Sequence, residues 1–276
     1  YHMTTTTAQA PNVLSHLEYY LQVIWPELNV NVVSTTEQWA GAAIAGPKSR
    51  ELLSKLFPNK DISNEGLPFM GYMEADLFGI PARIFRISFS GELAYEINVA
   101  SNFGTFMWEK TIEQGQQFNI QPYGTEALSN LRIEMGHVAG PELDGRTIPY
   151  DVSLEGLVSK KKDFVGKRSL NRVAFTLSTR QKVVGLVPID KKTVIPEGSH
   201  LVKDAKAKLP NPKLGHISSS CWSVEYNNPF ALAILQDGKN MIGEKLYAFS
   251  PLQNKTIPVE IVSSHYVDPK GERVRS

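Results

Sequence analysis

The sequence predicts an α+β domain followed by an all-β domain, and three observations support this fold class. The first half of the chain places apolar residues at helical spacing beside short apolar runs that are typical of buried strands. After about residue 180 the pattern changes to short alternating runs separated by Gly, Pro, Asn and Asp. The length of 276 residues suits one large or two medium domains. We therefore expect domains at residues 4–178 and 179–276.

Proline, glycine and apolar spacing define the elements of the first domain. In chain order we expect a helix between Pro11 and Pro26, a strand at 39–46, a helix opened by Pro47, a hairpin at 81–99, and helices capped by Ser101 and Thr125. The inward residues of these helices are Val13, Leu14, Leu17, Leu21 and Ile24; Leu52, Leu53 and Leu56; Phe103, Phe106, Met107 and Ile112; and Leu128, Leu131 and Met135. Gly91 supplies the free backbone of the hairpin turn, and Gly136 ends the last helix.

The second domain is predicted from regularly spaced short strands. They are expected at residues 183–189, 214–218, 230–235, 245–249 and 256–263. Such spacing is typical of a small β-barrel or a sandwich, and the residues alone do not choose between them.

Composition and charge exclude several classes of protein. The formal net charge is +1, so no bias points to nucleic acid or to an anionic membrane as a partner. Cys221 is the one cysteine, which rules out a disulfide within the chain and favours a reducing cytoplasm. No apolar run approaches the ~20 residues that span a bilayer, and the N-terminus shows no signal-peptide pattern.

Generic catalytic motifs are missing from the sequence. No Gly-x-Gly-x-x-Gly or Walker pattern indicates a flavin, NAD or ATP site. The six histidines show no spacing typical of metal ligands, so no metal site is expected. Cys221 is interpreted as a structural or surface thiol. Ser218, Ser219 and Ser220 lie beside His216, but this proximity is common by chance and a hydrolase is not favoured.

Glu96 is a charged residue in an otherwise apolar strand, between Tyr95 and Ile97. Period-two alternation places it on the face of Ala94 and Asn98. If that face is solvated, Glu96 is a surface charge. If the face lines a cleft, its two acceptor oxygens could bind the adjacent N–H donors of an aminopyrimidine. Composition and spacing leave both interpretations open.

Four segments, taken in order, resemble the aminomethyltransferase (glycine-cleavage T-protein) superfamily. They are residues 46–49 (Gly-Pro-Lys-Ser), 89–97 (Phe-Ser-Gly-Glu-Leu-Ala-Tyr-Glu-Ile), 124–136 (Gly-Thr-Glu-Ala-Leu-Ser-Asn-Leu-Arg-Ile-Glu-Met-Gly) and 164–170 (Phe-Val-Gly-Lys-Arg-Ser-Leu). Residues 34–40, 83–99, 122–127 and 159–170 narrow the resemblance to the alpha-subunit family of sarcosine oxidases. The resemblance covers nearly the whole chain and implies a partial aminomethyltransferase-like, folate-binding domain followed by a C-terminal β-barrel.

The resemblance also implies a chemistry. A flavin in another sarcosine oxidase subunit would oxidise sarcosine, and the resulting imine would reach tetrahydrofolate held by this module. The products would be 5,10-methylenetetrahydrofolate and glycine. The work of the domain would be to position the nucleophile and the electrophile, with a carboxylate assisting proton movement.

Residue by residue, the resemblance assigns cofactor-binding roles to Glu96, Phe89 and Tyr123. Glu96 falls on the glutamate with which the family binds the pterin, Phe89 on the aromatic residue that opens the hairpin motif, and Tyr123 is a weaker candidate. Arg132 and Glu134 match the family helix and are expected to form structural ion pairs. The essential aspartate of the family is expected upstream of this chain, so no catalytic residue is assigned within it.

Two residues depart from the family pattern, and they keep other functions open. Leu128 stands where the family helix carries an arginine, and Gly156 stands where a tryptophan is expected to pack near the pterin. The chain could therefore be a non-catalytic interaction module whose folate pocket has decayed. A stand-alone aminomethyltransferase is the second alternative, which the stretches shared with sarcosine oxidase disfavour.

Overall fold

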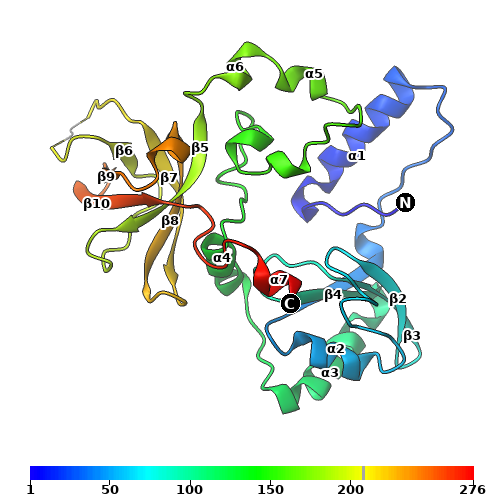
Figure 1. Ribbon diagram of the computed structural model, residues 1–276. Coiled ribbons are helices and arrows are strands. Elements are labelled where there is room, and N and C mark those ends of the chain that lie inside the picture. Colours follow the sequence, from blue (N-terminus) through cyan, green and yellow to red (C-terminus); the bar gives the residue numbers. More distant parts are fainter. Residues whose placement is uncertain (207–208) are drawn as a thin grey trace. The chain divides into compact units, whose positions relative to one another are not determined.

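The computed structural model describes residues 1–206 and 209–276, which divide into two compact units (Figure 1). Unit 1 comprises residues 1–87 and 93–120, and unit 2 comprises residues 88–92 and 121–276. The turn expected in the hairpin therefore packs within unit 2. The predicted domain boundary between residues 178 and 179 stays a prediction.

Unit 1 is built on a four-stranded antiparallel sheet with the strand order β1-β4-β3-β2. Its strands are β1 (Trp39–Ala45), β2 (Tyr72–Leu77), β3 (Ile80–Phe85) and β4 (Ala94–Ala100). Its helices are α1 (Ala10–Tyr19), which continues into a π-helical turn (Tyr20–Ile24), α2 (Ser49–Leu56) and α3 (Gly104–Gly115). Short 3-10 turns lie at Thr7–Gln9, Thr36–Gln38, Ser101–Phe103 and Gln116–Phe118.

The core of unit 1 lies between one face of the sheet and the helices α2 and α3. It contains Ile44, Ile84, Tyr95, Ile97 and Val99 from the sheet, with Leu52, Leu53, Leu56 and Met107 from the helices. Because side chains alternate along a strand, burial of Tyr95 and Ile97 directs Glu96 and Asn98 to the opposite face. The face predicted for Glu96 is therefore confirmed, as are the inward leucines of α2.

Unit 1 differs from the sequence-based expectations in four respects. The first hairpin strand ends at Phe85, because the buried Arg86 side chain turns to Asn64 and to the Leu67 carbonyl. The edge strand β2 was not predicted. Ser101 makes no capping hydrogen bond, and along α1 the expected inward residues are at most partly buried within the described structure.

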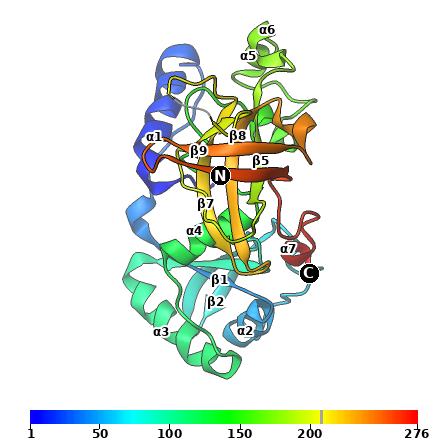
Figure 2. The ribbon, with the colours of Figure 1, turned by 90° about the vertical axis from the view of Figure 1, so that its left-hand side faces the viewer.

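Unit 2 joins α4 (Thr125–Glu134) and an extended loop region to a closed six-stranded barrel (Figures 1 and 2). The barrel order is β10-β5-β8-β7-β6-β9. Its strands are β5 (Gln181–Pro188), β6 (His200–Val202), β7 (Gly215–Ser223), β8 (Asn228–Gln236), β9 (Lys245–Ser250) and β10 (Lys255–Val262). Shorter helical segments are Pro149–Asp151, Glu155–Leu157, α5 (Lys167–Leu170), α6 (Val173–Thr176), Gly238–Met241 and α7 (Glu272–Arg275).

The predicted α+β fold followed by a β-barrel is confirmed. The second sheet is a barrel and not a sandwich, because its six strands close into a ring. Apolar residues that alternate along the strands fill its interior, among them Leu186, Leu201, Ile217, Ala233 and Val259. Ile133 of α4 packs against residues of β7 and β8 on the outside of the barrel. Within the part of the chain that the structure describes, no helix is long and apolar enough to cross a membrane.

Helix α4 differs from its expectation in its start and in its buried face. Gly124, not Thr125, precedes the first turn, and no side chain caps it. The buried residues of the helix are Arg132, Ile133 and Glu134, while Leu128 and Leu131 are partly buried. The helix ends as predicted, because Gly136 adopts a positive φ of 73° that glycine tolerates best.

Candidate functional site

The open face of the unit 1 sheet surrounds Glu96 with small and aromatic residues. In the antiparallel register, Glu96 lies opposite Ala43 of β1 and Phe85 of β3. Gly41 and Ala43 are exposed and present little side chain, so β1 leaves the Glu96 side of the sheet accessible. A side chain at Gly41 would come within 2.8 Å of Asn98 Oδ1. The Asn98 side chain therefore lies close over Gly41, on the same face of the sheet as the Glu96 carboxylate.

Glu96 is partly buried, and its carboxylate forms no hydrogen bond or ion pair with any residue that the structure describes. Burial raises the pKa of this carboxyl above its ordinary value. A half-buried carboxylate that the described residues leave without a partner is available to N–H donors that another molecule supplies. Glu96 is therefore the best ligand-binding candidate of unit 1.

Two further aromatic contacts lie on the same face of the sheet and were missed by the sequence reasoning. The Arg83 guanidinium stacks over Trp39 at 3.9 Å, and the rings of Tyr72 and Phe85 lie 5.1 Å apart. Arg83 and Phe85 stand on the side of β3 that pairs with Asn98 and Glu96. The sequence could have indicated Arg83 and Phe85, because they alternate along the first hairpin strand and so share one face of it.

Phe89 lies in the segment 88–92 of unit 2 and is 46% exposed. Its carbonyl oxygen lies 3.0 Å from Nδ1 of His137, and its ring lies 5.9 Å from the His137 ring. Tyr123, also exposed, belongs to unit 2 and lies two residues before α4. The structure thus brings Phe89 together with His137, whereas Glu96 belongs to unit 1.

Arg132 and Glu142 form a buried ion pair that ties α4 to the barrel. Arg132 Nη1 lies 2.9 Å from Glu142 Oε2, and their side chains are 7% and 0% exposed. Ser219 of β7 accepts a hydrogen bond from Arg132 and donates one to Glu142. The structural ion pair expected for Arg132 is confirmed. Glu134 instead accepts a long hydrogen bond from the Glu225 amide within the described chain.

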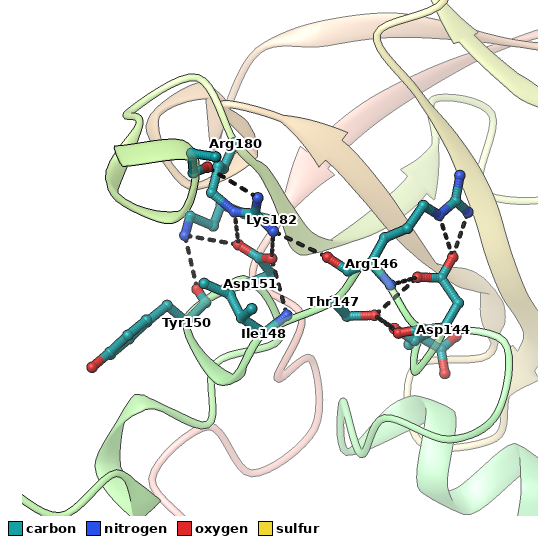
Figure 3. A network of polar contacts seen from close by, with 10 residues as sticks. Asp144, Arg146, Thr147, Ile148, Tyr150, Asp151, Arg180 and Lys182 are labelled. Carbon is teal, nitrogen blue, oxygen red and sulfur yellow. Dashed lines mark hydrogen bonds and ion pairs between the residues drawn. The ribbon is translucent and has the colours of Figure 1, made fainter. Parts of the chain in front are cut away.

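Asp151 anchors a second polar network, drawn in Figure 3. It accepts hydrogen bonds from Arg180, from Lys182 and from the Ile148 amide. Burial alone would raise the pKa of Asp151, but the Arg180 and Ile148 hydrogen bonds outweigh it and hold the pKa below its ordinary value. A small pocket beside the network is lined in part by Asp144, Arg146, Asp151, Arg180 and His216. Its arginines are already paired with aspartates, so the network is structural.

Other candidates from the sequence serve the fold. Ser218 donates to the Leu232 carbonyl, and Ser219 belongs to the buried network described above. Among the described residues, no group of three or more His, Cys, Asp or Glu side chains could hold a metal ion. Cys221 is buried in β7. Burial, together with nearby Glu134, raises its pKa to about 12.

Cys221 should therefore be inert in the folded chain. An aromatic disulfide reagent at about pH 8 should release no thiolate under native conditions, because the thiol is protonated and inaccessible. In denaturant, where the pKa returns to about 8.5, one equivalent should be released within minutes. Absorbance of the released thiolate measures both states. Rapid native reaction would contradict the placement of Cys221 in the core.

Two domain models match the chain, one over its first part and one over the barrel. Residues 1–162 match the GCVT N-terminal domain, and residues 181–268 match the glycine cleavage T-protein C-terminal barrel domain. The aminomethyltransferase T of the glycine cleavage system from Bartonella henselae has a similar structure, with a TM-score of 0.73 at 21% identity. The match covers 95% of this chain and 67% of the Bartonella henselae chain. This likeness supports the fold.

Curated relatives are similar at higher identity. The sarcosine oxidase subunit alpha of Rhizobium meliloti is 43% identical over 99% of this chain. An aminomethyltransferase of Chloroherpeton thalassium is 29% identical over 80% of this chain and 59% of its own length. The chain spans 28% of the length of the sarcosine oxidase subunit. The resemblance drawn from the sequence motifs is confirmed by these similarities.

Proposed function

This chain belongs to the glycine cleavage T-protein family, and we propose that it binds a reduced folate and serves one-carbon transfer to it. The observation that carries the proposal is the Glu96 carboxylate. It is partly buried on an open sheet face and has no partner among the residues that the structure describes. Tetrahydrofolate fits this site, because its aminopyrimidine edge presents adjacent N–H donors to a pair of carboxylate oxygens.

In this proposal the residues of the chain bind and orient the folate. Glu96 accepts hydrogen bonds from the pterin, and Phe89 and Tyr123 supply aromatic surface against which a ring can pack. Phe85, opposite Glu96 in the register, is a further aromatic neighbour. Tetrahydrofolate itself supplies the amine nucleophile that accepts the one-carbon unit. No proton-transfer residue is proposed within the chain.

The finer proposal is that the one-carbon unit comes from oxidised sarcosine. The similarity to sarcosine oxidase alpha subunits supports sarcosine as the source of the one-carbon unit and further subunits as partners. An imine as the donor, a flavin in the partner subunits and a cytoplasmic location complete the proposal. The products would be 5,10-methylenetetrahydrofolate and glycine. A competing function is an interaction module without folate. The position of Gly156 supports it, because this residue is exposed, offers no stacking ring, and leaves open space where a Cβ would meet no atom within 4 Å.

Calorimetric titration with tetrahydrofolate tests the proposal. The wild-type chain should bind, and Glu96→Gln should bind roughly tenfold more weakly or worse, because a charge-assisted contact contributes about 1.5–3 kcal/mol. The glutamine keeps the shape of the side chain while removing its charge and one acceptor. A loss of affinity without a loss of thermal stability would assign the effect to binding.

Glu74→Gln is the matched control. Glu74 stands on β2 on the same face of the sheet, is exposed, and accepts a hydrogen bond from Tyr72. Its substitution should leave folate affinity unchanged. Absence of binding by the wild-type chain would favour the interaction module, and equal losses in both variants would remove the specific role of Glu96.

A further inference from the structure

The segment 88–92, which carries Phe89, is held within unit 2 by three side chains. Gly91 packs so closely on Met135 that a Cβ would come within 2.1 Å of it, and its φ of 84° favours glycine. His137 contacts the Phe89 carbonyl. Arg273 binds the Glu92 carboxylate at the far end of the segment. These contacts fix the segment on both sides of Gly91.

Arg273 bridges two carboxylates with one guanidinium group. Its Nη1 lies 2.9 Å from Glu92 Oε1, and its Nη2 lies 2.7 Å from Glu225 Oε1. The planar guanidinium directs its N–H groups at fixed angles, so two acceptors define its orientation. Hydrogen bonds to Glu225 and then to Glu92 raise the pKa of Arg273 above its already high value, and it remains a cation.

The backbone beneath Arg273 is itself anchored. The Asp268 carboxylate accepts hydrogen bonds from the amides of Glu272 and Arg273, each at 2.8 Å. The amide of the buried Val267 donates to the Glu134 carbonyl at the end of α4, at 3.0 Å. Arg273 thus extends from a fixed turn at the start of α7, the terminal red helix in Figure 1. The backbone of Arg273 is therefore already ordered, and the side chain is the part that loses entropy when it binds Glu92.

We propose that Arg273 is a positioning residue that holds the segment 88–92, through Glu92, so that the Phe89 ring is preorganised for folate. The inference rests on the proposed function of Phe89. His137 restrains the Phe89 end of the segment through the Phe89 carbonyl and through a ring contact with centroids 5.9 Å apart. The Gly91 and Glu92 amides also donate hydrogen bonds to the Ser88 and Ser90 hydroxyls within the segment. Loss of Arg273 therefore removes one of several restraints on the segment, and part of the order of the Phe89 ring must then be supplied at the expense of binding.

A double-mutant cycle on folate affinity tests this role, using the full chain and tetrahydrofolate. Arg273→Gln should weaken binding roughly threefold to fivefold, the range of a partly exposed ion pair of up to about 1 kcal/mol. In a Phe89→Ala background the same substitution should have no effect, because the ring that it positions is absent. Arg273→Lys, which keeps the positive charge but lacks the planar guanidinium group, should recover part of the affinity. Arg275→Gln is the control, since Arg275 lies on the same helix and donates to the carbonyls of Lys270 and Gly271.

The outcomes separate this inference from the proposed function. If the wild-type chain binds folate and Glu96→Gln weakens binding, but Arg273→Gln does not, the positioning role is wrong and the proposed function stands. Equal losses from Arg273→Gln with and without Phe89 would also overturn it, because Arg273 would then act through stability alone. If the wild-type chain does not bind folate, both fail together. Thermal melts of each variant establish that the compared chains are folded.

Discussion

Glu142→Ala is expected to lower the free energy of unfolding of unit 2 by about 3–5 kcal/mol, the range for removing one partner of a buried ion pair. The Arg132 side chain is 7% exposed, so its charge would remain buried without a carboxylate. The Ala139 amide, which donates to Glu142 at 2.9 Å, would lose its acceptor as well. Hydrogen exchange of peptides from β7 and β8 measures the effect within unit 2.

Two further variants make this expectation specific. Glu155→Ala removes one partner of the exposed pair with Lys239 in the same unit, and should cost at most about 1 kcal/mol. The double variant Arg132→Met/Glu142→Leu removes both buried charges, and should be more stable than Glu142→Ala alone. If the double variant is less stable than Glu142→Ala, the cost arises from packing and not from an unpaired charge.

The sequence predicted the parts of the fold in which local pattern and burial agree. Leu52, Leu53 and Leu56 have helical spacing and lie in the core of unit 1. The long apolar runs of β5 and β8 likewise predicted strands that the barrel buries. Strand β6 has three residues, too few for a period to emerge. Strand β2 alternates the inward Met73, Ala75 and Leu77 with Glu74 and Asp76, but it was missed because Ala, Glu and Asp are depleted in strands.

The candidate site was predictable only where it depends on strand parity. Alternation around Glu96 predicted its face, and the register confirmed it. Some partners of Arg273 and Arg132 could not be predicted, because they lie far away in the chain. Arg273 contacts Glu92 across 181 positions, and Arg132 contacts Ser219 across 87. Such contacts follow from tertiary packing, which the local pattern of a single sequence does not reveal.

Asp151→Asn is expected to cost about 3 kcal/mol at neutral pH, since it breaks a buried pair. The Asp151 side chain is 3% exposed, and both Arg180 and Lys182 bind its carboxylate. The folded-state pKa of Asp151 is depressed. Its contribution is therefore complete above the unfolded pKa of about 3.9, and is lost as the pH falls through the folded value.

The difference between wild type and Asp151→Asn should then shrink under acid. Above about pH 5 the full difference should persist, and below about pH 3 it should fall steadily, because the wild-type carboxyl is itself becoming protonated. Urea unfolding at a series of pH values, followed by far-UV circular dichroism, measures it. Asp163→Asn, which changes an exposed carboxylate of the same unit, should show no such pH-dependent difference. A gap that stays constant from neutral to strongly acidic pH would mean that geometry, and not the charge of Asp151, stabilises the loop that it anchors to β5.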